Sequence, residues 1–169
     1  MRVANGASVQ KASTVNGAIE LGEHAQATEL GTVNGAITLG NASKVSGDVR
    51  AVNGSMRLGK GAQIGGKLGN VNGTIALDDA HVAGGMETVG GDITIGANSR
   101  VEGGILVDKP GQGWFHQGAQ RTPVILIGPH AVVQGTLQFK RDVVLKVSDG
   151  AQIGPVNGAT VVKFSGATP

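Results

Sequence analysis

The chain of 169 residues contains no cysteine, no tyrosine, one tryptophan and three phenylalanines. The absence of cysteine excludes disulfide bonds and thiolate metal sites, and no apolar run approaches the roughly 18 residues of a membrane span. With so few aromatic residues, the core has to be filled by valine, isoleucine, leucine and alanine, which suits thin stacked layers. The net charge of +2 is too small to indicate a nucleic-acid partner.

What the sequence does contain is 30 glycines and one short phrase that occurs five times. The phrase TVNGAIELG begins at Thr14 and returns as TVNGAITLG, AVNGSMRLG, NVNGTIALD and TVGGDITIG. Its valines stand at Val15, Val33, Val52, Val71 and Val89, which gives a period of about 18 to 19 residues. Apolar residues recur at nearly every sixth position within each period, which indicates three short sides per turn of a solenoid.

We therefore predict an all-β fold, a single-stranded parallel β-helix with triangular coils of 18–19 residues and about seven to eight coils. Each strand should pair with its copy about 4.8 Å above. A right-handed coil is preferred over a left-handed one, because parallel crossovers are right-handed by default. Residues 1–169 should form one domain, with an inserted loop at 108–124 and terminal coils at 125–169.

The repeated phrase also predicts which residues face the core and which turn the corners. We expect its valines to point inward, and we expect the residues that follow each inward position, such as Asn16 and Gly22, to form corners with positive φ. The asparagines should stack as a structural ladder and hydrogen-bond through their amides along the axis. The members of this ladder are Asn16, Asn34, Asn53 and Asn72.

The segment VSGDVRAVNGSMRLGKGAQIGGKL, residues 45–68, resembles the β-helix of bactofilins, which are bacterial polymer-forming scaffold proteins. The same cadence covers most of residues 9–107 and returns from 125 to 160. The repeated VNG is also similar to repeats of adhesin-type β-helices. These resemblances imply either a self-associating scaffold or a secreted binding module. The six-residue rule is shared by left-handed hexapeptide acyltransferases and the related carbonic anhydrases.

The titratable residues do not form a catalytic pattern. His24 and His130 occupy equivalent places five coils apart, roughly 24 Å, and His81 stands in an outward register. A zinc site needs about three ligands around one ion, so the enzyme hypothesis requires a trimer that brings in residues of neighbouring chains. Asp78 and Asp79 are not extended into an acidic patch by the neighbouring coils. We therefore expect no enzyme activity, metal or cofactor.

Binding is expected at the inserted loop or at the ends. The loop carries Trp114, Phe115, His116 and Arg121, which are the candidates for contacting a ligand or partner. Phe164, near the last coil, is the candidate for an end contact. The first hypothesis is a non-enzymatic structural scaffold of the bacterial cell envelope or cytoskeleton that self-associates through its ends. The alternative is a secreted adhesin-like module that uses the Trp114 loop to hold a glycan or protein.

The sequence does not define the compartment. Removal of a signal peptide would place the protein in the bacterial periplasm or at the cell surface, and otherwise it would be cytoplasmic.

Overall fold

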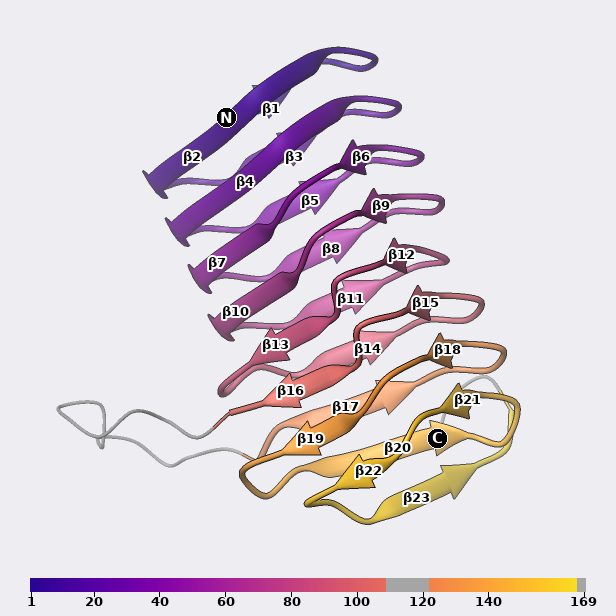
Figure 1. Cartoon of the computed structure of the whole chain (residues 1–169). Coiled ribbons are helices and arrows are strands. Elements are labelled where there is room, and N and C mark those ends of the chain that lie inside the picture. The colour runs from indigo at the N-terminus through magenta and orange to yellow at the C-terminus, as the bar shows by residue number, and fades with distance from the viewer. Residues whose placement is uncertain (109–121, 167–169) are drawn as a thin grey trace, which may run out of the picture.

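The computed structural model describes residues 1–108 and 122–166, and it contains no helix within these ranges. Parallel strands stack as a β-solenoid of about eight turns, as the repeat predicted. In Figure 1 the strands β4, β7 and β10 lie in front and run leftward, and β5, β8 and β11 lie behind and run rightward. Because the axis descends from the N-terminus in this view, the coil is right-handed.

Each coil has three sides, and we call the three resulting surfaces faces 1, 2 and 3. Face 1 is a nine-stranded sheet of β1 (Arg2–Val3), β3 (Ile19–Leu21), β5 (Ile37–Leu39), β8 (Met56–Leu58), β11 (Ile75–Leu77), β14 (Ile93–Ile95), β17 (Val124–Ile127), β20 (Val144–Ser148) and β23 (Val161–Phe164).

The second sheet has 14 strands and bends to form the other two faces. Face 2 contains β6 (Lys44–Val45), β9 (Gln63–Ile64), β12 (His81–Val82), β15 (Arg100–Val101), β18 (Val132–Val133) and β21 (Gln152–Ile153). Face 3 contains β7 (Val49–Asn53), β10 (Leu68–Asn72), β13 (Met86–Thr88), β16 (Ile105–Val107), β19 (Leu137–Phe139) and β22 (Val156–Asn157). The long strands β2 (Ser8–Asn16) and β4 (Gln26–Asn34) run across both faces.

The longer coils gain their additional residue at one corner. Gln26 of β4 pairs with Lys44, whereas Leu30 in the same strand pairs with Val49, so the register shifts by one residue between the two pairs. The extra residue therefore lies at the Gly47–Asp48 corner. It divides the single long strand of the first two coils into the two short strands of the later coils.

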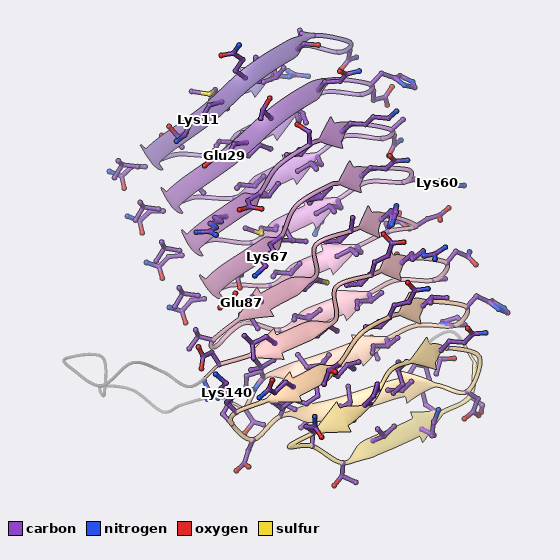
Figure 2. The ribbon with its side chains drawn as sticks, in the orientation of Figure 1. Lys11, Glu29, Lys60, Lys67, Glu87 and Lys140 are labelled. Carbon is purple, nitrogen blue, oxygen red and sulfur yellow. The ribbon has the colours of Figure 1, made fainter. Side chains whose placement is uncertain are left out.

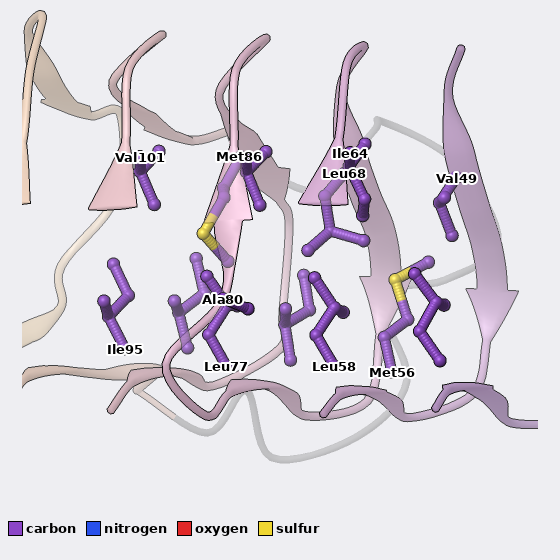
Figure 3. Close-up of a cluster of buried hydrophobic side chains, with 14 of the residues drawn as sticks. Val49, Met56, Leu58, Ile64, Leu68, Leu77, Ala80, Met86, Ile95 and Val101 are labelled. Atoms are coloured by element: carbon purple, nitrogen blue, oxygen red, sulfur yellow. The ribbon is translucent and has the colours of Figure 1, made fainter. Parts of the chain in front are cut away.

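The core is a thin column of aliphatic side chains. Figure 3 shows Met56 and Leu58 from face 1, Ile64 from face 2 and Leu68 from face 3 meeting inside the coil, and all four are at most 1% exposed. Their equivalents in neighbouring coils stack above and below them. Each coil thus buries its apolar surface against the next coil as well as within itself.

The valines of the repeated phrase do not face this core. Val15, Val33, Val52 and Val71 are 63%, 39%, 40% and 38% exposed, so the prediction that they point inward is wrong. On face 3 the buried residue Leu30 is followed by Gly31 and then by buried Thr32. Because side chains alternate along a strand, the next residue, Val33, lies outside.

The corner prediction is also wrong in its details. Positive φ occurs not at Gly22 or Gly40 but two residues later, at His24 (57°) and Ala42 (58°), with the same column continuing to His130 (60°). Gly40 is needed for a different reason. A Cβ atom at this position would lie 2.8 Å from the carbonyl oxygen of Leu21 in the preceding coil.

Candidate functional site

The predicted loop residues Trp114, Phe115, His116 and Arg121 lie outside the described residues. The candidate functional surfaces of the described part are therefore the asparagine ladder, face 3 and the two ends of the solenoid. No helix in the described ranges is long and apolar enough to cross a membrane.

The asparagine ladder forms along the corner between faces 3 and 1. The side-chain amide of Asn34 donates to Asn16 Oδ1 at 3.0 Å, Asn53 donates to Asn34 at 3.2 Å, and Asn72 donates to Asn53 at 3.1 Å. All four residues are exposed, and each bond joins one coil to the next. The ladder is a structural device that holds the register of the first four coils. A later VNG, at Val156–Gly158, is out of this register, because Asn157 pairs with Gln138.

The histidines remain apart in the described structure. His24 and His130 both lie at the corner where each coil places one residue in the positive-φ region. Between them this corner is occupied by Ala42, Gly61, Asp79 and Asn98. His81 lies in the outward register of Gln63 and Arg100. Its Nε2 atom is 3.1 Å from Glu102 Oε2 but makes no hydrogen bond there. Within the described ranges, no three His, Cys, Asp or Glu side chains are grouped to hold a metal ion.

Face 3 carries an open groove of about 920 Å³ that crosses the first five coils. Its outward residues form three columns along the axis. The charged column contains Lys11, Glu29, Asp48 and Lys67, the central column contains Ser13, Gly31, Arg50, Gly69 and Glu87, and the valine column contains Val15, Val33, Val52, Val71 and Val89. Figure 2 shows Lys11, Glu29, Lys67 and Glu87 following one another across β2, β4, β10 and β13.

Sequence reasoning missed this surface because it followed the inward residues. The outward residues were nevertheless readable, since Lys11 and Glu29 are separated by one period of the repeat and pair in adjacent strands. Aligning the residues four positions before each repeated valine would have shown the charged column.

The N-terminal end of the solenoid is formed by β1 and β2, which pair only with β3 and β4 in the described ranges. Most of its inward positions are apolar, because Val3 and Ala12 are buried and Val9 is partly buried, while Thr14 stands in register with buried Thr32. The amide of Gln26 donates to the Ala7 carbonyl of the coil before it. By equivalence, the amide of Ser8 points away from the stack.

The C-terminal end is formed by β21, β22 and β23, each of which pairs on one side within the described residues. Lys163 stands in the register of buried Val147 and is exposed. Phe164 is partly buried, is in register with Ser148, and accepts a 2.9 Å hydrogen bond from the Asp149 amide through its carbonyl oxygen.

Comparison with known proteins assigns no family to the chain. No family model matches it, and neither the curated proteins nor the solved structures give a match.

Proposed function

We propose that this chain is a non-enzymatic structural scaffold protein of the bacterial cell envelope or cytoskeleton, and that copies of it associate through the ends of the solenoid. The observation that carries this proposal is the nine-residue strand β2, which has its outer edge unpaired in the described structure. A long strand edge presents a row of free amide and carbonyl groups to another chain.

The apolar inward positions of the N-terminal end support the same proposal. Val3 and Val9 belong to the columns that are buried between coils farther along the rod, such as Leu21 and Ala27. A second copy stacked on this end would cover both columns and pair the edge of β2.

A non-enzymatic role is supported by the distribution of titratable groups. The described histidines and carboxylates are spread over corners and faces, and His24 and His130 lie five coils apart. The adhesin-like alternative depends on Trp114 and its neighbours, which lie outside the described residues.

Light scattering combined with negative-stain microscopy, over a range of protein concentration and salt, tests the proposal. We expect the mass to grow with concentration and rods to join end to end. Growth should persist in high salt, because backbone pairing and apolar contacts are screened little. A single chain of 16.9 kDa at every concentration would contradict the proposal and favour the adhesin-like alternative. A discrete trimer would also contradict end-to-end growth, and it would direct the search for chemistry to residues that neighbouring chains bring together.

A further inference from the structure

The charges on face 3 follow an order that has a consequence for assembly. We number the first five coils by their face-3 strands, β2, β4, β7, β10 and β13. Coil 1 carries Lys11, coil 2 carries Glu29, coil 4 carries Lys67 and coil 5 carries Glu87. Coil 3 carries both Asp48 and Arg50, which lie 3.5 Å apart. The signs along the axis are therefore positive, negative, neutral, positive and negative.

These charges are available to a partner. The Lys11 and Glu29 side chains are 63% and 51% exposed, and their 3.7 Å ion pair within the chain is solvated. Lys67 and Glu87 make no ion pair within 4.0 Å among the described residues. Beside them runs the valine column, an exposed apolar stripe on a corner where an isolated rod would leave it in water.

If this series of charges is read in the opposite direction along the axis, each charged coil has the opposite sign. We propose that face 3 is the docking surface for a second copy of this chain, which packs against it face to face with its axis antiparallel. The two-fold axis of this dimer runs along β7. Glu29 then meets Lys67 of the second copy in the same column, and Lys11 reaches Glu87 of the second copy in the adjoining column. Each dimer therefore contains four intermolecular ion pairs.

The same symmetry matches the apolar residues. A two-fold axis along the strand direction keeps each column opposite its own copy, so that Val33 meets Val71 of the second copy and Val52 meets Val52. Gly31 and Gly69 flank Arg50 in the central column. The two arginines can therefore lie side by side in the hollows above these glycines, within reach of the Asp48 carboxylates.

A parallel dimer of the same face does not have this complementarity. A two-fold axis along the solenoid, over the central column, would place each coil opposite the same coil but reverse the strand direction, so that Glu29 would face Val33 and Lys67 would face Val71. The charges would then be covered by valines without an opposite charge, and covering an unpaired charge destabilises an interface. The order of the charges thus selects the antiparallel arrangement.

The size of the surface sets how the pairing has to be measured. Five coils at about 4.8 Å and five residues per strand at about 3.3 Å give roughly 400 Å² on each copy. This is about half of what a standard stable interface buries per partner. The dimer is therefore weak between single rods, and it strengthens by avidity where rods joined end to end repeat it.

A charge swap tests both the surface and its orientation. We expect Glu29→Lys alone and Lys67→Glu alone to weaken self-association about tenfold each, because either change converts two attractive pairs into repulsive ones. An equimolar mixture of the two variants should associate at least as well as the wild type. In the mixed dimer, positions 29 and 67 are both lysine in one copy and both glutamate in the other, so both pairs are attractive again.

Sedimentation velocity at concentrations up to about 1 mM provides the measurement. Glu20→Lys is the matched control, because Glu20 has a similar exposed ion pair, with Arg2 at 3.7 Å, but lies on face 1. This control should sediment like the wild type. The proposal would be overturned if the sedimentation profile of the mixture equalled the sum of the profiles of the two separate variants. It would also be overturned if the wild type formed no dimer through face 3 at any concentration.

Cysteine cross-linking provides a second test, because the chain has no cysteine of its own. With a short bis-maleimide, Val52→Cys should form a covalent dimer by itself. Val33→Cys and Val71→Cys should each stay monomeric alone and form a dimer when mixed. Cross-linking of Val33→Cys with itself would instead indicate a pairing in which each coil lies opposite the same coil, and it would overturn the antiparallel one. These outcomes concern the side of the rod, so they are independent of whether its ends associate.

Discussion

The two ends of the solenoid differ, although they are the first and the last coil of the same regular stack. On faces 2 and 3 the N-terminal end presents β2, a nine-residue strand, whereas the C-terminal end presents β21 and β22, which have two residues each. The inward columns of the N-terminal end contain Val3 and Val9. The inward column of β23 contains Lys163, in register with buried Val147.

This difference indicates which end can receive another coil. Short edge strands and charged residues in inward positions are the devices by which proteins prevent edge-to-edge pairing. The C-terminal end has both, in the two-residue strands β21 and β22 and in Lys163. The N-terminal end continues the regular pattern to its last described strand. We therefore expect the N-terminal end to dominate self-association.

Substitutions in the interior coils should have the largest effects on stability, because these coils pack against neighbours on both sides. Ile75→Asp should lower the free energy of unfolding by about 4 kcal/mol or more, because Ile75 is fully buried and the new carboxylate would have no partner. Val71→Asp, four residues earlier, should cost less than about 1 kcal/mol, because Val71 is 38% exposed. Urea denaturation followed by circular dichroism measures both, and equal losses would contradict the assignment of inward and outward columns.

Val9→Lys should make the N-terminal end resemble the C-terminal one. A lysine enclosed by a stacked copy would cost about 3 kcal/mol or more, which corresponds to at least a hundredfold higher concentration for end-to-end growth. The fold should persist, because Val9 is only partly buried and a lysine there can extend to water. Gln10→Lys is the control, since it adds the same charge at an exposed position. Light scattering should separate the two variants, and similar growth curves would exclude the N-terminal end as the junction.

Lys163→Val is the opposite change at the other end. Removing the charge from the inward column of β23 should promote stacking there, by about 1 kcal/mol or roughly fivefold in concentration. The effect is smaller than that of Val9→Lys because the neighbouring strands remain short. Lys146→Val, in the outward register of β20, removes the same charge without opening the inward column. If both variants gain association equally, net charge and not the inward position would be the cause.

The fold could be predicted from the sequence because its period shows in the outward asparagines and in the aliphatic residues of faces 1 and 2. The second inward column of face 3 could not, because it contains polar residues that resemble surface residues, such as Thr32 and Thr88. Asn70 is 6% exposed and donates to the Gly73 carbonyl at 2.9 Å, and buried Thr88 donates to Asn70 Oδ1 at 2.7 Å. These bonds satisfy the buried polar groups, and only a structure shows them.

The candidate site residues also divide into those that the repeat could place and those that it could not. Equivalence between coils was enough to place His24, His81 and His130, because each stands at a fixed point of the repeat. Residues 108–124 break the repeat, so equivalence says nothing about Trp114. The groove on face 3 was missed for another reason. The sequence prediction assigned its valines to the core, so the apolar column was not recognised on the surface where Glu29 and Lys67 lie.

Asn53→Ala provides the smallest and most local test, because it compares the ladder-bearing coils near the N-terminal end with the coils that lack the ladder. Asn53 donates to Asn34 and accepts from Asn72, at 3.2 and 3.1 Å. Two exposed hydrogen bonds are lost, so the free energy of unfolding should fall by about 1 kcal/mol. Asn157→Ala removes an exposed amide from a VNG phrase that lies outside the ladder register, and it should change the urea midpoint much less. If both substitutions cost the same, the stacked amides add nothing beyond what a single asparagine contributes, and the register of the first four coils would depend on their buried columns alone.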